Sequence, residues 1–193
     1  LDGELGDGVR KVLWQPGDEI GVNPDYGNTY EISKFTADIS SLSETAEFKG
    51  GACLWERYKA FYPYQEETLR DSMNYFIFNL PTEQKYVRNT FDPKAAPMTA
   101  TAAYGETFQF RNLCGVLALQ LKGEETVKSI TFKAIGEDGS LYFVAGDFEV
   151  NPSVEGDPEI RLHGNGRQFV KLICESPVEL DSEIATAFYF VLP

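Results

Sequence analysis

The stretch from residue 108 to residue 148 constrains the fold more than any other part of the chain. Within it, residues 116–121 are almost entirely apolar, which is typical of a strand buried on both faces. Residues 127–135 alternate with a period closer to two than to the helical period of about 3.6. Residues 136–140 suit a tight hairpin loop that leads into a third strand at 141–148. Three such strands need others to cover their apolar faces, so we expect this stretch to be the centre of a β-sandwich.

Short strand candidates separated by turn residues occupy most of the remaining sequence. Residues 83–103 contain two prolines and several alanines, and we expect a long crossover loop with one helical turn there. Periodicity typical of a longer helix is absent, so the predicted fold class is all-β, an antiparallel β-sandwich with long loops and little helix. The strand candidates are residues 11–14, 20–22, 30–39, 45–49, 59–64, 75–78, 160–162, 169–174 and 187–193.

Length and charge narrow the class of protein. A chain of 193 residues can bury its own core, and we expect a single domain over residues 1–193. The net charge of −13 repels phosphate groups, so nucleic acid and anionic lipid are not expected partners. No apolar run reaches the roughly 18 residues of a membrane-spanning helix, so no transmembrane segment is predicted. The first residues lack the basic and apolar regions of a signal peptide.

Cysteine and histidine usage points away from metal and nucleophile chemistry. Cys53, Cys114 and Cys174 form an odd set without Cys-x-x-Cys spacing, and we expect free thiols, which do not identify the compartment. The single histidine, His163, lies between two strand candidates in a glycine-flanked loop. Alone it cannot build a multi-histidine zinc site, and no Gly-x-Ser-x-Gly motif supplies a nucleophile, so we interpret His163 as a loop residue.

Acidic residues are plentiful, but no two of them stand out as a catalytic pair. The neighbouring pairs Glu66-Glu67, Glu124-Glu125 and Glu137-Asp138 all fall in predicted turns, where a solvated carboxylate needs no functional explanation. Residues 25–28 offer oxygen ligands without the spacing of a helix-loop-helix calcium motif, and a turn is the better interpretation. We therefore predict a non-enzymatic protein with no catalytic residues, no metal site and no cofactor.

Aromatic residues near Trp55 leave one binding hypothesis open. Trp14, Trp55, Phe61, Tyr62 and Tyr64 either pack within the sheets or form a platform that stacks on sugar rings. Trp55 is the best candidate for a sugar contact because its charged neighbours, residues 56 and 57, favour exposure. A carbohydrate-binding module is therefore the first alternative function. A glycan hydrolase is the second, and it requires two carboxylates roughly 5 to 9.5 Å apart in a cleft.

Seven short motifs occur in a consistent order along almost the whole chain. They are Val-Leu-Trp-Gln-Pro-Gly-Asp-Glu-Ile-Gly-Val at 12–22, Ala-Phe-Tyr-Pro-Tyr at 60–64, Leu-Pro-Thr-Glu-Gln at 80–84, Ala-Pro-Met at 96–98, Phe-Arg-Asn-Leu-Cys-Gly-Val-Leu at 110–117, Val-Lys-Ser-Ile at 127–130 and Phe-Tyr-Phe-Val-Leu-Pro at 188–193. In this order they resemble the fimbrillin-like (Mfa-like) surface proteins of Bacteroidales, and in particular their N-terminal domain.

The resemblance implies a transthyretin-like β-sandwich of the Greek-key type, part of a pilus (fimbria) subunit or an anchored cell-adhesion protein. Such proteins are exported as lipoproteins to the outer membrane or fimbrium, and neighbouring subunits assemble by adding a strand to a groove that proteolysis frees. Other fimbrial subunits are thus the expected partners, together with a host or microbial surface protein or glycan. The resemblance also implies that residues 14–22 form a hairpin with Trp14 capping the core, and that residues 112–121 form the central strand.

Two features depart from the family pattern. No lipid-attachment cysteine stands near Leu1, and the chain stops at Pro193, where the second β-sandwich of the family is expected to begin. We therefore expect either an N-terminal domain or a single-domain relative that need not polymerise.

Overall fold

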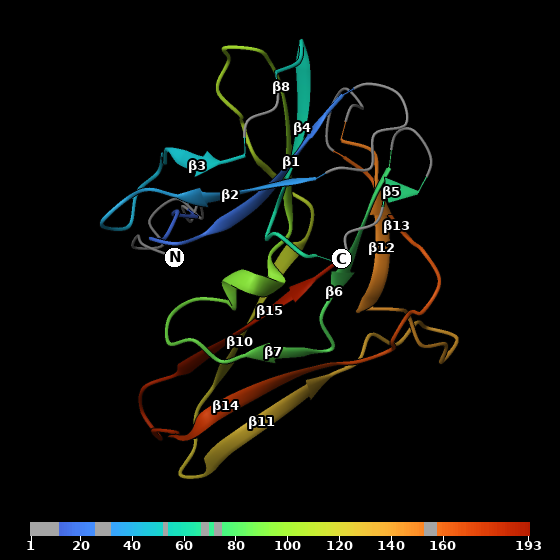
Figure 1. Cartoon of the computed structure of the whole chain (residues 1–193). Coiled ribbons are helices and arrows are strands. Elements are labelled where there is room, and N and C mark those ends of the chain that lie inside the picture. The colour runs from blue at the N-terminus through green and yellow to red at the C-terminus, as the bar shows by residue number, and fades with distance from the viewer. Residues whose placement is uncertain (1–11, 26–31, 52–53, 67–69, 72–74, 153–157) are drawn as a thin grey trace.

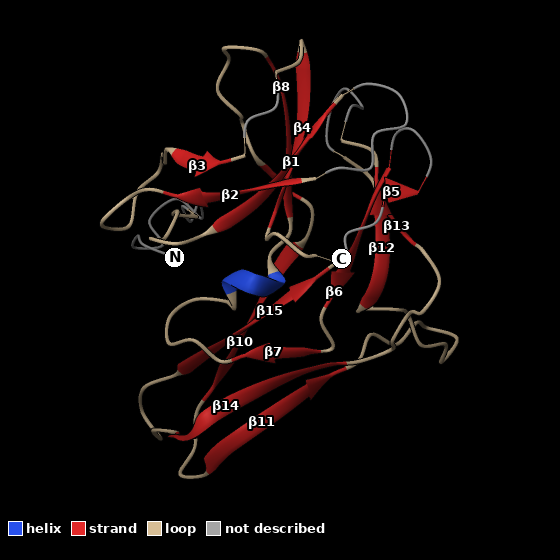
Figure 2. Cartoon of the chain, viewed as in Figure 1, coloured by secondary structure: helices blue, strands red, loops and turns tan. Residues whose placement is uncertain are grey.

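The computed structural model describes residues 12–25, 32–51, 54–66, 70–71, 75–152 and 158–193. These residues form fifteen strands and a single 3-10 turn, so the predicted all-β class with little helix is confirmed (Figure 2). Within the same residues, no helix is long or apolar enough to cross a membrane.

The largest sheet has six antiparallel strands in the order β3-β2-β1-β4-β8-β9 and occupies the upper part of Figure 1. At its centre, β1 and β4 pair so that Val22 lies opposite Ala60, which in turn lies opposite Ala100 of β8. The strands are β1 (Glu19–Pro24), β2 (Ser33–Ala37), β3 (Phe48–Gly50), β4 (Arg57–Tyr62), β8 (Met98–Ala103) and β9 (Arg111–Asn112).

A four-stranded sheet, in the order β13-β12-β6-β5, stands beside it. Its central pair aligns Phe148 with Phe78, and the two rings stack with centroids 6.1 Å apart. The strands are β5 (Arg70–Asp71), β6 (Tyr75–Leu80), β12 (Gly146–Val150) and β13 (Ile160–Leu162).

Two smaller sheets pack face to face in a sandwich-like arrangement. One holds β10 (Gly115–Leu121) and β15 (Thr186–Leu192); the other holds β11 (Thr126–Phe132), β14 (Val170–Glu179) and β7 (Glu83–Lys85). β7 runs parallel to β14, which departs from the purely antiparallel arrangement that the sequence predicts. The transthyretin-like, Greek-key connectivity stays a prediction.

β15 is the strand that joins the two halves of the core. Phe188 and Phe190 belong to an apolar cluster shared with Leu172 of β14, whereas Tyr189 and Val191 belong to the cluster that includes the rings of β4 and β6. Alternate side chains of a strand point to opposite faces, so an apolar run at 188–191 is buried on both sides.

The prediction that residues 108–148 form the centre of the sandwich is wrong. β10 has one strand partner, β15, and its first four residues are exposed; β10 and β11 do not pair with each other. Residues 141–144 are not a strand, because β12 begins at Gly146. An apolar run is compatible with an edge strand as well as a central one, and the sequence alone does not separate the two.

Two other expectations need correction. Trp14 does not form a hairpin with residues 20–22: it bridges to Ser43, while β1 pairs with β2 and β4. Residues 83–103 contain the expected turn, at Pro93–Ala95, but also the strands β7 and β8. β8 was missed because its Met-Thr-Ala-Thr-Ala-Ala sequence lacks the large β-branched and aromatic side chains typical of strands.

Candidate functional site: the free edge of strand β10

β10 presents an unpaired edge seven residues long. One side of the strand is hydrogen-bonded to β15 from Gly115↔Leu192 to Leu121↔Thr186, and the other side has no strand partner within the described residues. Val116 and Leu117 are 45% and 41% exposed, and as neighbours they face opposite sides of the sheet. The edge therefore offers main-chain donors and acceptors flanked by apolar side chains on both faces.

The other long edge in this part of the molecule is protected. β11 is also seven residues long, but it carries Lys128 and has a register shift between Val127 and Ser129. A charged side chain and a bulge are two devices that prevent a strand edge from pairing with another chain. The remaining described edge strands, β3, β5, β7, β9 and β13, are two or three residues long.

Gln84 of β7 closes the opposite edge of the β10–β15 pair. Its side-chain Nε2 donates a hydrogen bond to the carbonyl oxygen of Val191 at 2.8 Å, and the Val191 N–H donates to Gln84 Oε1 at 2.9 Å. Gln84 is only 1% exposed, so these bonds satisfy main-chain groups that water cannot reach. Gln84 therefore occupies the outer edge of β15 at Val191.

The apolar face next to the free edge is incompletely covered. Leu119 lies opposite Phe188 in the strand pairing. Leu119 and Leu121 are half-buried and pack against the apolar cluster that contains Phe188, Phe190 and Leu172. On the facing sheet, Ile130 and Phe132 are also half-buried members of that cluster. An additional strand beside β10 would remove part of this apolar surface from water.

Trp14 caps the outer face of the six-stranded sheet, as the family resemblance implies. Its ring lies edge-to-face against Phe48, Tyr62 and Phe110, with centroids 5.0, 5.3 and 5.2 Å away. The role of Trp14 is therefore packing at this face rather than stacking on an exposed sugar.

Trp55 is exposed, at 41%, as its charged neighbours indicate. Its backbone N–H donates to the Tyr58 hydroxyl at 2.5 Å. Tyr64 lies beyond the opposite end of β4, a strand of six residues that spans roughly 20 Å. Trp55 and Tyr64 therefore do not form one continuous row, and a glycan contact would involve Trp55 alone or together with other groups.

A polar cleft of about 1140 Å³ lies between the six-stranded and four-stranded sheets and is lined in part by Asp18, Tyr64, Asn79 and Asp147. Two of its carboxylates, those of Asp18 and Asp147, accept hydrogen bonds from neighbouring side chains. The Tyr62 hydroxyl donates to Asp18 at 3.1 Å, and the Asn79 amide donates to Asp147 at 2.8 Å. Burial, with the nearby Asp18 carboxylate, raises the pKa of Tyr62 and keeps it a neutral donor.

His163 lies at the rim of this cleft, immediately after β13. Its Nδ1 is 3.1 Å from Glu149 Oε2, and its backbone N–H donates to the carbonyl oxygen of Asp147 at 2.7 Å. These contacts hold the loop against β12 and agree with the interpretation of His163 as a loop residue. No group of three or more potential metal ligands occurs among the residues that the structure describes.

The pairs Glu124-Glu125 and Glu137-Asp138 lie in turns or loops, as expected. Glu124, Glu125 and Glu137 are exposed. The Ser140 hydroxyl, together with the Ser140 N–H that donates to Asp138 at 2.9 Å, holds the pKa of the Asp138 carboxyl below the ordinary value. Glu67 and residues 26–28 lie outside the described residues.

The two described cysteines are free thiols, as predicted. Burial raises the pKa of Cys114 to about 12 and also raises that of Cys174. Because the thiolate is the reactive form, neither thiol is set up as a nucleophile. Cys53 lies outside the described residues.

The sequence analysis predicted a strand at residues 112–121 but nominated no residues for a strand-addition site. It missed the position of β10 at a free edge and the role of Gln84. One signal was available: residues 112–121 contain no charged side chain, and charged side chains are what usually protect an edge strand from pairing with another chain. Gln84 carries no local signal, since its partner Val191 is 107 positions away.

Comparison with known proteins bears on the fold. No protein-family profile and no curated protein sequence matches the chain. Among solved structures, the chain is similar to the crystal structure of a proposed cell adhesion protein from Bacteroides ovatus, with a TM-score of 0.52 and 14% sequence identity. The match covers 93% of this chain and 68% of the other. At this identity the likeness concerns the fold alone.

Proposed function

We propose that this chain is a non-enzymatic cell-surface protein with an adhesive or structural role, and that β10 accepts a strand from a neighbouring subunit. The observation that carries the proposal is the free edge of β10, with Val116 and Leu117 exposed on its two faces. Long apolar edges are hazardous in a protein that acts alone, because they template pairing with other chains. A long apolar edge is useful, however, in a protein whose function is to pair with a strand of another chain.

The physical basis is β-strand addition. An incoming strand would form main-chain hydrogen bonds along the outer edge of Gly115–Leu121 and so fix its register. Its alternate side chains would cover Val116 on one face, and Leu117 with Leu119 on the other. Main-chain bonds would contribute orientation, and the covered apolar area would contribute most of the affinity.

The motif order supports a more specific form of the proposal, in which the protein is a fimbrillin-like pilus subunit or anchored adhesin of Bacteroidales. The fold shared with a proposed cell adhesion protein of Bacteroides ovatus is consistent with that role. On this view the protein is exported, reaches the outer membrane or fimbrium as a lipoprotein, and contacts other subunits by strand exchange. The clusters that link β4, β6 and β15 support treating residues 1–193 as one domain.

The test uses the intact gene product before and after limited trypsin cleavage near its N-terminus. Light scattering and negative-stain microscopy should show fibres that depend on cleavage. The double substitution Val116→Lys and Leu117→Lys should abolish them by adding charge to the edge, whereas Ser129→Lys on the matched seven-residue strand β11 should not. Fibres that form equally well with charged β10 would contradict the proposal.

Carbohydrate binding is a second candidate, favoured by the exposure of Trp55. An exposed indole can stack on a sugar ring and contribute binding energy without strand exchange. A protein that stays monomeric after cleavage and binds a glycan through Trp55 would favour this alternative.

A further inference from the structure

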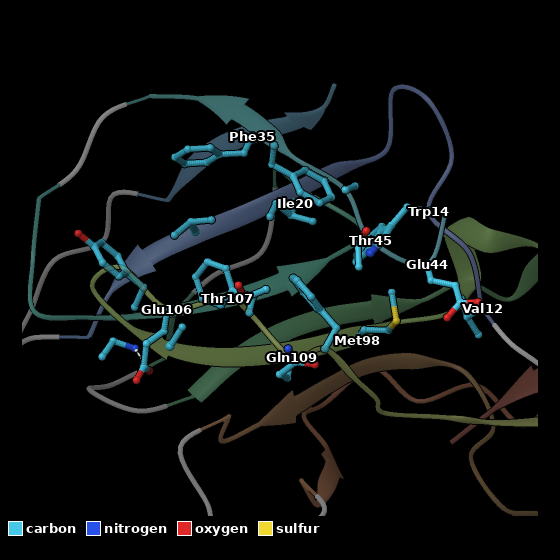
Figure 3. A pocket seen from close by; sticks show the side chains of 18 of the residues that line it. Val12, Trp14, Ile20, Phe35, Glu44, Thr45, Met98, Glu106, Thr107 and Gln109 are labelled. Atoms are coloured by element: carbon cyan, nitrogen blue, oxygen red, sulfur yellow. Dashed lines mark hydrogen bonds between the residues drawn. The ribbon is translucent and has the colours of Figure 1, made fainter. Parts of the chain in front are cut away.

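A pocket of about 630 Å³ opens on the outer face of the six-stranded sheet, away from the edge of β10 (Figure 3). Its floor consists of buried apolar side chains, Ile20 and Val22 from β1 with Met98 and Ala102 from β8. This volume lies within the range of about 300 to 1,000 Å³ that is typical of sites for single small organic molecules.

The floor of the pocket is low because the centre of the sheet carries small side chains. Alternate residues of a strand share a face, so Met98, Ala100 and Ala102 lie on the outer face of β8. Ala60 of β4 is paired with Ala100 and therefore lies on the same face. Three of these four buried side chains are single methyl groups, so they rise little above the sheet.

The walls of the pocket are aromatic, and contacts between the rings hold them in place. Trp14 lies edge-to-face against Phe48 and Phe110, and Phe110 packs against Phe108. All four rings are half-buried, so each keeps part of its surface within reach of a ligand. Walls that are ordered before binding reduce the entropy that a complex has to overcome.

The pocket is elongated along β8. Met98 begins this strand and pairs with Tyr62, which contacts Trp14; Ala103 ends the strand and lies beside Glu106. Six extended residues place Met98 and Ala103 roughly 17 Å apart. A carbon–carbon bond advances an extended alkyl chain by roughly 1.3 Å, so the pocket matches a straight chain of about 13 carbons.

Hydroxyl groups lie at the two ends of this apolar trough. Thr45 lines the pocket near Trp14, and Thr107 follows Glu106 at the other end (Figure 3). Both threonines are exposed, and a hydroxyl group can donate or accept a hydrogen bond. A molecule with a long apolar chain and a small uncharged head would match both the floor and the rim.

We propose that this pocket binds an uncharged straight-chain amphiphile, a single alkyl chain with a hydroxyl-bearing head, as in a monoacylglycerol. The chain would lie along β8 on Met98 and Ala102 and against the aromatic walls, where each methylene removed from water stabilises the complex. The head would reach the rim and exchange hydrogen bonds with Thr45 or Thr107. This site is independent of strand addition at β10.

The probes are the straight-chain primary alcohols hexanol, octanol and decanol, titrated into the full chain carrying Trp55→Phe so that Trp14 is the only tryptophan observed. A saturable change in Trp14 fluorescence is expected, with calorimetry as a second measurement. Each added methylene should strengthen binding about three- to fourfold, because even the decanol chain is shorter than the pocket.

Ala102→Phe tests where the chain lies. Ala102 pairs with Tyr58, whereas Met98 pairs with Tyr62 beside Trp14, so the new ring would fill the end of the floor that is far from Trp14. Decanol should bind more than about tenfold more weakly, whereas hexanol, which fits at the Trp14 end, should lose less than about threefold. Loss of folding would weaken all three alcohols alike, so the dependence on chain length separates the two effects.

A second variant changes a wall and leaves the sheet intact. Phe108→Ala removes a half-buried ring and should weaken decanol about two- to tenfold. Tyr142→Ala is the matched control and should leave the affinity unchanged, because Tyr142 is 61% exposed and is not among the lining residues. Circular dichroism checks that each variant is folded.

The proposal is overturned if decanol produces no saturable signal in either assay, or if the affinity does not rise from hexanol to decanol. It is also overturned if folded Ala102→Phe and Phe108→Ala bind decanol as tightly as the control does.

Discussion

Among single residues, Gln84 contributes to stability although glutamine is usually a surface residue, because it is buried and bonds both main-chain groups of Val191. Gln84→Leu should lower the free energy of unfolding by about 3 kcal/mol, because the N–H and carbonyl of Val191 would be left buried without partners. Chemical denaturation with an unchanged slope would measure the loss. Gln120→Ala on the exposed part of β10 is the control, and equal effects of the two substitutions would contradict the role given to Gln84.

The half-buried thiol of Cys114 should make stability depend on alkaline pH. Burial raises its pKa from 9.0 to about 12, so between these values the folded state holds a proton that the unfolded state has lost. Stability is then fully present below pH 9 and should fall by about 1 kcal/mol for each pH unit above it. The pKa of Tyr62 is also raised, so Tyr62 should lower the stability further at higher pH.

Denaturation at a series of pH values from 8 to about 11 measures this dependence. Cys114→Ala should flatten the decline, whereas a slope unaffected by the substitution would show that other groups cause it. The thiol should also react slowly with alkylating reagents in the folded protein, since little thiolate is present at neutral pH.

Among the elements, the close pairing of β1 with β4 depends on Gly21. Gly21 lies opposite Phe61, and a Cβ at this position would overlap the Phe61 ring. Gly21→Ala should therefore destabilise the protein by about 1 to 3 kcal/mol, because it would displace the Phe61 ring from the apolar cluster that includes the rings of β6. Gly115→Ala at the start of β10 is the matched control, because a Cβ there meets no atom closer than 4.0 Å.

The sequence predicted which segments form strands better than it predicted their partners. Strands near residues 20–22, 75–78 and 187–193 lie where alternation and aromatic content place them. The sequence did not predict that β10 lies at an edge. An apolar run indicates that a segment prefers burial, but it does not indicate how many strands pair with it. β8 was missed because alanine has a low strand propensity. Ala100 and Ala102 are nevertheless buried in the sheet, where small side chains allow close packing.

At the scale of the whole molecule, the part of the chain that the structure describes forms four sheets connected by three apolar clusters, and β15 belongs to two of these clusters. This arrangement encloses β15 and leaves β10 at the boundary with solvent, so the assembly that we propose would add a strand without rearranging the core. The sequence predicted the all-β class of fold, which the structure confirms. Through the family resemblance of its motifs it also predicted an adhesive function, which stays a proposal. The free edge of β10 could not be predicted from the sequence, because the pairing partner of β10 lies about 70 residues further along the chain.

Binding of a glycan would use a different surface. Trp55→Ala should abolish binding of any glycan recognised by stacking on Trp55, and leave assembly at β10 unchanged because Trp55 is absent from that edge. A glycan screen of the intact gene product and of the substituted protein measures this. Retained glycan binding in Trp55→Ala would remove Trp55 as the contact.

Hydrogen exchange of the β10 amides, in the monomer and after protease-triggered assembly of the intact gene product, tests strand addition most directly. We predict that outward-facing amides of Gly115–Leu121 exchange rapidly in the monomer and become strongly protected in the assembly, while those of β11 change little. Failure to assemble, or an assembly in which the β10 amides exchange as they do in the monomer, would contradict a strand-accepting role for this edge.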